Sequence, residues 1–486
     1  MKLKTISKFV LGAICGTLVT ISIYATADGN ISTTTAVNSG IPVNEVNNFA
    51  KVYSITKNYY VESVTDTKLM NGAINGMLSN LDPHSSYLDA DSFKQLSEMT
   101  SGEFAGLGIE ISKNKDDTIK IVAPIDGTPA YYAGLKSGDS IVKIDGVPVN
   151  TLTLDQAVKR TRGKPNTKVT LTIARKNELK PLSFTITRAV INIKSIKYTW
   201  IKPNYAYVRI TNFQSNTVQD LVNALITLNK ENPKIAGLVV DLRDDPGGIL
   251  QSAVGVAGAF LPNNDLVVYT DGRLAPSKQK FYVKADDYQT EDNSVDALSK
   301  LPAKFKTIPM VVLINQGTAS ASEIVAGALQ DYKRATIMGT KSFGKGSVQT
   351  VIPLSKDTAV KLTTALYYTP KGRSIQAKGI APDVIVQSEY DELYDSWDMT
   401  EASLDHHLNN PNGKTESGVT NKTPVITPPK QLKTQAELKE RIDQRISKMP
   451  KVSSPNIAQI DLKNDFQLQW ALNVLEGKPL PSVKTK

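Results

Sequence analysis

Residues 311–324 read Val-Val-Leu-Ile-Asn-Gln-Gly-Thr-Ala-Ser-Ala-Ser-Glu-Ile. The four apolar residues are typical of a buried strand, the small polar residues that follow are typical of a tight turn, and the last residues begin a helix. This order places Ser320 at the amino end of a helix, where the dipole favours a developing negative charge and the N–H of Ala321 can donate to an oxyanion. Because Ser is also a common N-cap residue, this stretch alone leaves a capping role equally open.

The segments on both sides of this stretch alternate between strand and helix patterns. Apolar runs of strand length are separated by amphipathic runs of helix length, and this alternation predicts an α/β core over residues 189–386. The strands are expected at 205–210, 237–242, 266–269, 310–314, 336–338, 348–353 and 359–367, and the helices at 218–228, 250–261 and 320–330.

A second pattern, of short strands separated by turn residues, fills residues 101–188. Its strands are expected at 119–122, 140–144 and 169–173. Between them lie Gly127-Thr128-Pro129-Ala130-Tyr131-Tyr132-Ala133-Gly134-Leu135 and Ser137-Gly138-Asp139, followed by Ile144-Asp145-Gly146. These residues resemble a PDZ domain, so a small β-rich PDZ-like domain is expected to be inserted ahead of the α/β core.

PDZ domains bind a peptide as an added strand and hold its terminal carboxylate on backbone N–H groups of a glycine-rich loop. The stretch that fits this loop is Phe104-Ala105-Gly106-Leu107-Gly108-Ile109. Its glycines allow the backbone to approach an anion closely. An ordinary tight turn before a strand is the alternative, and the position at the start of the domain favours peptide binding.

The two ends of the chain have patterns of their own. Residues 43–100 are predicted as an N-terminal helical segment that is interrupted by a turn at 81–88. Residues 387–433 are polar and lack periodicity, and they are predicted as a linker. Residues 434–486 are predicted as a C-terminal helical segment with helices at 435–447 and 465–475.

Residues 1–27 have the features of an export signal. Three lysines among the first eight residues precede an apolar run at 9–24, and Ala25-Thr26-Ala27 has the small-x-small pattern of a signal peptidase site. A cleaved signal peptide is expected because Gly, Thr and Ser residues dilute the run. A retained membrane anchor stays open, since about 19 residues can span a bilayer. The protein is therefore expected in the periplasm or on the extracytoplasmic face of the cell membrane.

The composition argues against several kinds of site. Cys15, the single cysteine, lies inside the export segment, so the mature chain is expected to have neither a disulfide nor a zinc-type Cys/His cluster, and no metal or cofactor is predicted. The 57 Lys and Arg residues exceed the 47 Asp and Glu residues by 10, but no block of five consecutive basic residues occurs. A basic but evenly mixed surface is therefore expected, without a nucleic-acid partner.

A serine nucleophile needs a base, which is most often a histidine. His406 and His407 lie beside the linker, and His84 lies in a turn where a hydrogen-bonded role fits it better than catalysis. Lys345, which lies between two predicted strands and is flanked by glycines, is the candidate base. To accept a proton it must be neutral, so burial has to lower its pKa from about 10.4 towards 7 or 8. A solvated loop lysine is the alternative.

In combination these features resemble the carboxyl-terminal processing peptidases, also called tail-specific proteases, a Ser/Lys family with a PDZ domain. The resemblance runs over residues 49–386 and again over 465–469. The stretches that carry it are Leu81 to Leu88, Asp241-Leu242-Arg243-Asp244-Asp245-Pro246-Gly247-Gly248, Gly317 to Glu323, Phe343 to Gln349 and Gly379-Ile380-Ala381-Pro382-Asp383-Val384.

The resemblance implies roles for three side chains: Ser320 attacks the peptide carbonyl, Lys345 takes its proton, and Gln349 orients the lysine. It also implies a crotonase-like layering of the α/β core. Movement of the PDZ domain as a gate, a homodimer formed by the terminal helices, and a regulatory adaptor are further expectations that rest on the resemblance alone.

The resemblance implies an oxyanion hole that combines the N–H of Ala321 with that of Gly247 or Gly248. Two departures from the family pattern bear on this site. Thr318 stands where the family often has Ser, and Asp244-Asp245 stand where Asn is common. The aspartates add negative charge beside the expected oxyanion, so the choice between the two glycines stays open.

The sequence therefore predicts an exported serine endopeptidase that recognises protein C-termini through its PDZ domain and cleaves near them. The expected chemistry is an acyl-enzyme on Ser320 with Lys345 as general base. A catalytically inactive PDZ scaffold is the alternative. A penicillin-type acyltransferase or β-lactamase needs Ser-x-x-Lys on one helical turn, and the residue three after Ser320 is Glu323, which argues against that class.

Overall fold

The computed structural model describes residues 42–480 except 114–117, 126, 177, 290–295, 389–399, 414–422, 429–436, 438–456 and 459. The expected export segment lies outside these residues, as does all of the expected helix 435–447 except Glu437. No helix within the described ranges is both long enough and apolar enough to cross a membrane.

A seven-stranded sheet forms the centre of the core. Its strand order is β10-β11-β12-β15-β16-β19-β20, and every neighbouring pair is parallel except β10 and β11. The central strands β12 (Gly237–Asp241) and β15 (Met310–Ile314) are fully buried, as expected for apolar runs that are covered on both faces. The other strands are β10 Ile196–Lys202, β11 Tyr205–Ile210, β16 Thr336–Gly339, β19 Val384–Val386 and β20 Val425–Ile426.

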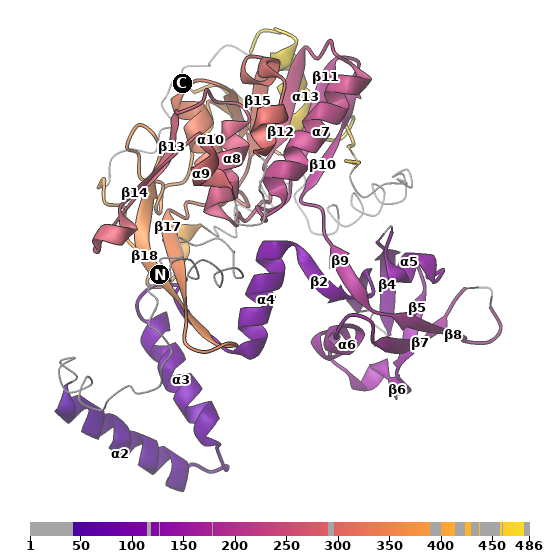
Figure 1. Ribbon diagram of the computed structural model, residues 1–486, viewed down its shortest axis with the longest axis vertical. Helices are drawn as coiled ribbons and strands as arrows, with labels where there is room; N and C mark the ends of the chain where they lie inside the picture. The colour runs from indigo at the N-terminus through magenta and orange to yellow at the C-terminus, as the bar shows by residue number, and fades with distance from the viewer. Residues whose placement is uncertain are drawn as a thin grey trace, which may run out of the picture.

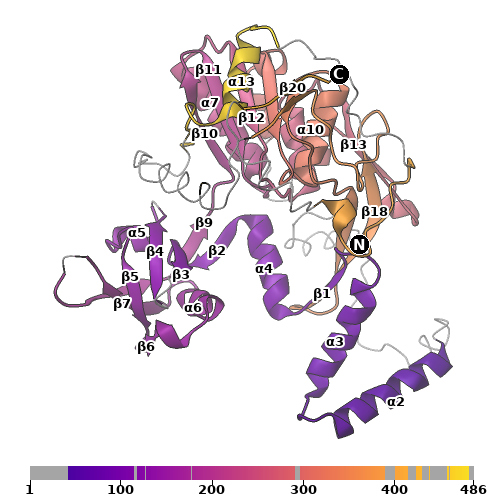
Figure 2. The same ribbon diagram turned by 180° about the vertical axis from the view of Figure 1, so that it is seen from behind.

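Helices cover both faces of this sheet. Because successive strand residues point to opposite faces, the neighbours Val239 and Val240 belong to two different hydrophobic layers. Val240 packs in the layer of α7, α8 and α10, and Val239 packs in the layer of α13. Figures 1 and 2 show the two layers from opposite sides. These helices are α7 Thr217–Glu231, α8 Leu250–Gly258, α10 Ala321–Asp331 and α13 Phe466–Leu475.

A second, antiparallel sheet stands beside the central one (Figure 1). Its strand order is β1-β18-β13-β14, and β17 also pairs with β18. The long strand β18 therefore pairs both with β1, which belongs to the N-terminal turn at 81–88, and with β17, which follows Lys345. The strands are β1 Ser86–Leu88, β13 Leu266–Gly272, β14 Gln279–Tyr282, β17 Ser347–Pro353 and β18 Ala359–Tyr368.

The PDZ-like domain is a separate six-stranded sheet with its own hydrophobic core. Its strand order is β3-β4-β5-β7-β8, with β6 paired to β5. It joins the rest of the chain through α4 (Ala90–Ser101) on one side and through β9 (Ala189–Asn192), which pairs with β2 (Glu103–Gly106), on the other (Figure 1). Its elements are β3 Ile109–Lys113, β4 Ile119–Pro124, α5 Pro129–Tyr132, β5 Ser140–Ile144, β6 Val147–Pro148, α6 Leu154–Thr161, β7 Lys168–Ala174 and β8 Leu182–Thr187.

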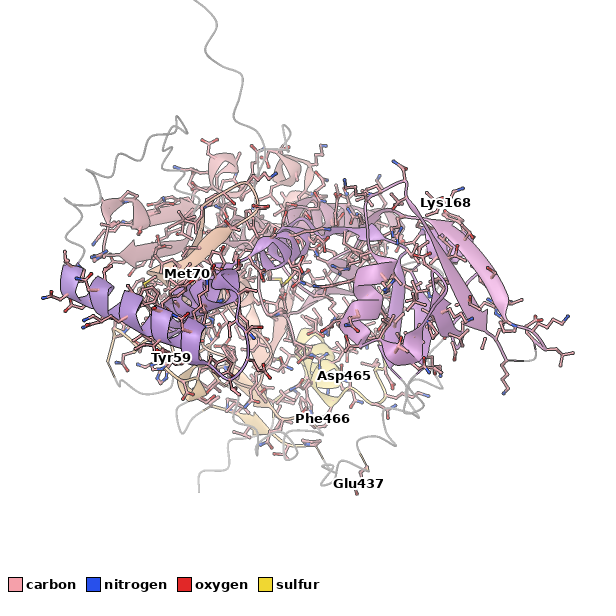
Figure 3. All side chains as sticks on the ribbon, turned by 90° about the horizontal axis from the view of Figure 1, so that it is seen from below. Tyr59, Met70, Lys168, Glu437, Asp465 and Phe466 are labelled. Atoms are coloured by element: carbon pink, nitrogen blue, oxygen red, sulfur yellow. The ribbon has the colours of Figure 1, made fainter. Side chains whose placement is uncertain are left out.

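The first two described helices form an arm that projects from the body of the molecule. α2 (Val43–Tyr59) contains no buried residue, and it meets α3 (Asp66–Ser79) through contacts of Tyr53 and Lys57 with Asp66. Figure 3 shows α2 at the edge of the molecule, with Tyr59 at its end and Met70 on α3. The helix therefore exposes apolar side chains, among them Val43, Val46, Phe49, Val52 and Ile55.

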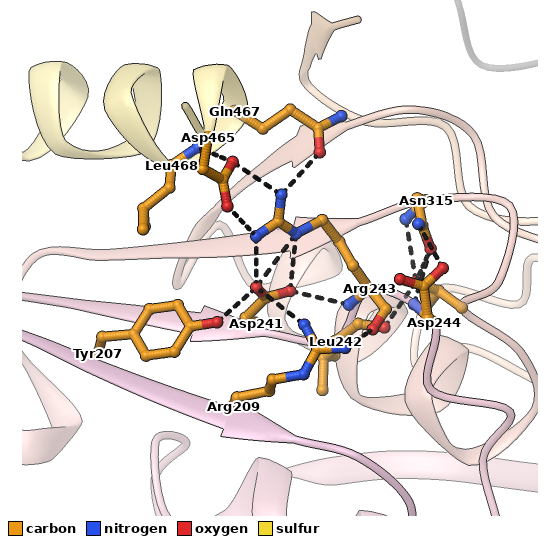
Figure 4. Close-up of polar contacts among 11 residues, drawn as sticks. Tyr207, Arg209, Asp241, Leu242, Arg243, Asp244, Asn315, Asp465, Gln467 and Leu468 are labelled. Atoms are coloured by element: carbon orange, nitrogen blue, oxygen red, sulfur yellow. Dashed lines mark hydrogen bonds and ion pairs between the residues drawn. The ribbon is translucent and has the colours of Figure 1, made fainter. Parts of the chain in front are cut away.

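A buried ion-pair cluster fixes α13 to the end of β12 (Figure 4). The guanidinium of Arg243 lies 2.6 Å from an oxygen of Asp241 and 2.7 Å from an oxygen of Asp465, the N-cap residue of α13. It also donates to the Gln467 side chain at 3.0 Å. Asp241 in turn accepts a hydrogen bond from the Tyr207 hydroxyl at 2.7 Å. The segment that follows β12 is thereby anchored before it reaches the glycines at 247 and 248.

The structure corrects two details of the sequence interpretation. The expected turn at 81–88 contains the short strand β1, and the first part of the expected carboxylate loop is the strand β2. Both strands pair with segments far along the chain, so no local pattern marks them. The remaining short helices are η1 Val149–Thr151, η2 Ala275–Ser277, α9 Ala285–Tyr288, η3 Ala297–Lys300, η4 Ala303–Lys306 and η5 Glu401–Ser403.

Candidate active site

Ser320 is the N-cap residue of α10 and follows the turn after β15. Its φ of 55° and ψ of −115° lie in a region that residues other than glycine rarely occupy. The preceding residues are fixed by hydrogen bonds, because the N–H of Ala319 donates to the carbonyl of Asp245 at 2.9 Å and the hydroxyl of Thr318 donates to the carbonyl of Leu242 at 2.7 Å. Backbone strain that the surroundings enforce in this way is frequent at catalytic positions.

Lys345 lies in the loop between β16 and β17 and is half-buried. Burial, and after it the neighbouring charge of Lys361, lowers the pKa of Lys345 to about 8. The carboxyl groups of Glu401, Glu323 and Asp82 act in the opposite direction. With a pKa near 8, roughly a tenth of the Lys345 amines are neutral at pH 7, so the residue can act as a base.

Glu323 joins the serine segment to the lysine loop. Its Oε2 accepts the N–H of Ser320 at 2.8 Å and the N–H of Lys345 at 2.9 Å. Its Oε1 accepts the N–H of Gly344 at 2.8 Å and the hydroxyl of Ser342 at 2.5 Å. Burial raises the pKa of Glu323 to about 7, although these donors favour the ionised form. One fully buried carboxyl group therefore holds the backbone of both catalytic candidates.

Tyr367 makes a second connection between the same two segments. It comes from β18 and is buried, and its hydroxyl lies within hydrogen-bond distance of the carbonyl oxygens of Ser320, at 3.0 Å, and of Lys345. Burial raises the pKa of Tyr367 well above its usual range, so the hydroxyl stays a donor. The serine and lysine segments are thus held together on two sides.

The glycine turn lies directly against the nucleophile. A Cβ atom on Gly247 would stand 2.8 Å from the nitrogen of Ala321 and 2.8 Å from the Cβ of Ser320. A Cβ atom on Gly248 would stand 2.1 Å from the carbonyl oxygen of Phe213. Their φ values of 96° and 142° also disfavour any side chain. Only glycines allow the turn to approach Ser320 this closely.

Asp245 stabilises the glycine turn from inside the protein. Its side chain is fully buried, and its Oδ1 accepts the N–H of Gly247 at 2.9 Å. Its carbonyl accepts the hydroxyl of Ser322 at 3.0 Å. Its Oδ2 has no hydrogen-bond partner among the described residues, and burial raises the pKa of Asp245 to about 7. The N–H of Gly247 is therefore already engaged within the turn.

Gln349 lies on β17, and its side chain is buried. Its Nε2 atom donates to the hydroxyl of Ser347 at 2.9 Å and, more weakly, to that of Thr363 at 3.4 Å. These hydrogen bonds keep the amide within the antiparallel sheet. Orientation of the Lys345 amine by Gln349 stays a prediction.

His84 forms a pair with a carboxylate that comes from the far end of the core. Its Nε2 lies 2.8 Å from Oε2 of Glu401, which is fully buried and also accepts a hydrogen bond from Gln376 at 2.9 Å. The N–H of His84 donates to Asp82 at 2.9 Å, and the N–H of Glu401 donates to the carbonyl of Phe343 at 3.1 Å. This pair connects the turn at 81–88 to the lysine loop, in keeping with a hydrogen-bonded role for His84.

The expected peptide-binding stretch is divided between two strands. Phe104, Ala105 and Gly106 belong to β2, and Ile109 begins β3. Leu107 is buried, and Gly108 has a φ of 77° in the short link between the strands. β3 stands at one end of the strand order of its sheet. A loop therefore remains only at Leu107 and Gly108, next to a sheet edge.

Some residues of the site carried little or no sequence signal. Glu323 served only to argue against a Ser-x-x-Lys enzyme, although Ser followed three residues later by Glu is the signature of a capping box. Tyr367 and Glu401 approach the site from distant elements, so no local pattern indicates them. Within the described parts of the chain, no group of three or more His, Cys, Asp or Glu side chains is placed to hold a metal ion.

Three family models match the chain. Peptidase family S41 matches residues 204–386, the PDZ domain matches residues 95–174, and the activating protease CtpB N-terminal domain matches residues 9–92. The peptidase model covers the strands and turns that carry Ser320, Lys345 and the glycine turn.

Proteins of this kind are also similar over most of their length. A carboxy-terminal-processing protease from Bartonella bacilliformis is 45% identical over 373 residues, which are 76% of this chain and 81% of that protein. A probable CtpA-like serine protease from Staphylococcus aureus is 37% identical over 344 residues, which are 71% of this chain and 65% of that protein. The solved photosystem II D1 C-terminal processing protease is 30% identical, with a TM-score of 0.39, and the match covers 69% of this chain and 86% of that one. By the family models and the Bartonella relative, the chain belongs to the carboxy-terminal-processing proteases, serine-type peptidases with a PDZ domain.

Proposed function

We propose that this carboxy-terminal-processing protease cleaves peptide bonds with Ser320 as nucleophile and Lys345 as general base. The observation that supports this most is the single carboxyl group of Glu323, which accepts the N–H groups of both residues. The lowered pKa of Lys345, about 8, adds a base that is partly neutral near physiological pH. Tyr367 supports the same arrangement, because its hydroxyl lies within hydrogen-bond distance of the carbonyl oxygens of both residues.

The proposed reaction has two halves. In the first, the neutral amine of Lys345 takes the proton of the Ser320 hydroxyl while the oxygen attacks the peptide carbonyl. The resulting ammonium then protonates the leaving amine, and an acyl-enzyme remains. In the second half, Lys345 takes a proton from the water that attacks the ester, and it returns this proton to the Ser320 oxygen as the shortened chain leaves. The reaction needs no cofactor.

For the oxyanion hole we propose the N–H groups of Ala321 and Gly248. Ala321 is the first residue of α10, where backbone N–H groups lack partners within the helix. The N–H of Gly247 donates to Asp245, which makes it a poorer donor to a substrate. Gly248 is the neighbouring glycine of the same turn, and it is exposed to solvent. We therefore propose Gly248, and not Gly247, as the second donor.

The PDZ domain fits a role in the capture of substrates with exposed C-termini. β3 stands at the edge of its sheet, so an extended peptide can add to it as a further strand. For the terminal carboxylate we propose the backbone N–H groups of Leu107 and Gly108, in the short link before that strand. We propose that movement of this domain about α4 and β9 presents the preceding chain to Ser320.

Location and assembly are further parts of the proposal. The lysines, the apolar run and the small-x-small site in residues 1–27 support export, either with a cleaved signal or with a retained membrane anchor. The exposed apolar side chains of α2 support a homodimer in which this helix is covered by a second copy. We also propose a crotonase-like layering of the core, and an adaptor protein as a partner that regulates activity.

Mass spectrometry of a protein with a free C-terminus tests the proposed function. We expect the wild-type enzyme to shorten the substrate from that end, and Ser320→Ala and Lys345→Ala each to leave it intact while still binding a C-terminal peptide. Retained cleavage by Lys345→Ala would require a different base. Failure of a fluorophosphonate to label Ser320 in the wild type would favour the inactive PDZ scaffold.

A further inference from the structure

The glycine turn contains one ionisable side chain that the Ser/Lys mechanism does not use. Asp245 is fully buried, and its Oδ1 accepts the N–H of Gly247 at 2.9 Å. Its Oδ2 has no hydrogen-bond partner among the described residues. An ionised carboxylate with one bare oxygen is costly there, because no donor among the described residues replaces its lost hydration. The neutral acid loses much less hydration, so the site favours a proton on Oδ2.

The surrounding charges do not compensate a negative charge at this position. Arg209 and Asp241 are the charged groups that act on the carboxyl of Asp245. Arg209 is directed elsewhere, since it lies 3.5 Å from Asp241 and donates to the carbonyl of Arg243 at 3.1 Å. Asp241 has the same sign as an ionised Asp245 and opposes its ionisation. The pKa of Asp245, which burial raises to about 7, agrees with this geometry.

We propose that Asp245 is a positioning residue of the oxyanion turn that works as the neutral acid, so that loss of its Oδ2 proton slows acyl transfer to Ser320. This inference rests on the proposed function. An ionised carboxylate would oppose the negative charge that develops on the substrate oxygen, because Gly247, its hydrogen-bond partner, packs directly against Ser320 and Ala321. The proton released at higher pH goes to solvent, and no further reactant is needed.

The proposal predicts opposite proton requirements at two residues. Lys345 must lose its proton and Asp245 must keep its own, so the rate should rise and then fall as the pH increases. Glu323 also titrates near this range, with a pKa of about 7. All four groups that contact its carboxyl donate hydrogen bonds to it, however, so ionisation of Glu323 strengthens these bonds. Its ionisation therefore contributes to the rise in rate with pH and not to the fall. Of these three groups, Asp245 is the one whose ionisation slows the reaction at alkaline pH.

Asp245→Asn tests the proposal, because the amide has the same shape and cannot ionise. We would measure kcat/KM for a peptide with a free carboxyl end, and the rate at which a fluorophosphonate labels Ser320, from pH 5.5 to 9.5. The labelling rate does not depend on capture by the PDZ domain. We expect both rates of Asp245→Asn to rise with pH as in the wild type but not to fall at alkaline pH. At pH 9 they should exceed the wild-type rates at least about tenfold, since about 99% of groups with a pKa of 7 are ionised there.

Asp244→Asn is the matched control. Asp244 is the neighbouring carboxylate, but it is exposed and accepts a hydrogen bond from Asn315, so its replacement should leave the wild-type profile in place. An alkaline fall that persists in Asp245→Asn overturns the inference and leaves the proposed function standing. A folded Asp245→Asn variant that is slow at every pH also overturns it. A wild-type enzyme without activity at any pH overturns the proposed function, and this inference with it.

Discussion

At Glu323, one buried side chain binds the backbone N–H groups of both catalytic candidates. Its two carboxyl oxygens accept four donors, two of which are the N–H groups of Ser320 and Lys345. Its charge also raises the pKa of Lys345 and so limits how far burial can lower it. Glu323 therefore has a structural effect, because it fixes the backbones of Ser320 and Lys345. It also has an electrostatic effect, because it partly stabilises the charged form of the Lys345 amine.

Glu323→Gln separates these two effects. The amide presents an N–H₂ group to N–H donors, so we expect kcat to fall at least about tenfold and the free energy of unfolding to fall by about 2 kcal/mol. The loss of negative charge should also move the rising limb of the pH profile to lower pH, because the pKa of Lys345 decreases further. Urea unfolding measures the loss of stability, and the pH dependence of kcat measures the fall in rate and the shift of the profile. Glu178→Gln, at an exposed position, is the control. If Glu323→Gln kept the wild-type kcat and an unshifted pH profile, the two effects assigned to Glu323 would be contradicted.

At the scale of elements, continuous apolar runs were the easiest part to predict. The expected strand 310–314 is β15, and the helix expected from Ser320 begins one residue later as α10. Local composition identifies such elements because both their faces are buried. By contrast, β2 is defined by its pairing of Glu103 with Asn192, a contact that no local pattern reveals. Tyr367 and Glu401 were missed at the site for the same reason.

The Arg243 cluster shows how one element depends on another. Arg243→Met would leave the carboxylates of Asp241 and Asp465 buried without their partner, so we expect the free energy of unfolding to fall by about 3 kcal/mol. The measurement is urea unfolding, with α13 expected to become more accessible to protease. Lys278→Met is the control: its ion pair with Asp271 is about half exposed and should contribute less than about 1 kcal/mol. Equal losses in the two variants would mean that the cluster does not anchor α13.

At the scale of the whole molecule, the chain consists of an arm, a PDZ domain and a peptidase core (Figure 1). The PDZ domain contacts α4 through the pairs Arg162 with Glu98, at 2.5 Å, and Lys159 with Asp91, at 2.7 Å. Both pairs are at least partly exposed, and such pairs contribute little to stability. The interface is therefore easy to rearrange, as the proposed movement of the PDZ domain requires.

The arm leads to a prediction about assembly. Val52 on α2 is 62% exposed, and a charge at this position should disfavour burial of the apolar stripe against a second copy. We expect the wild type to behave as a dimer and Val52→Asp as a monomer in size-exclusion chromatography with light scattering. Asn47→Asp adds the same charge to the more polar side of the same helix and should remain a dimer. A monomeric wild type would contradict the proposed dimer.

The rate at which a fluorophosphonate labels Ser320 between pH 5 and 7, in the wild type and in Lys345→Ala, tests the central claim most directly. With Lys345 as a base whose pKa is lowered to about 8, the wild-type rate should rise through this range, and the variant should label only at background. A rate that does not change with pH, or a variant that labels as fast as the wild type, would contradict it.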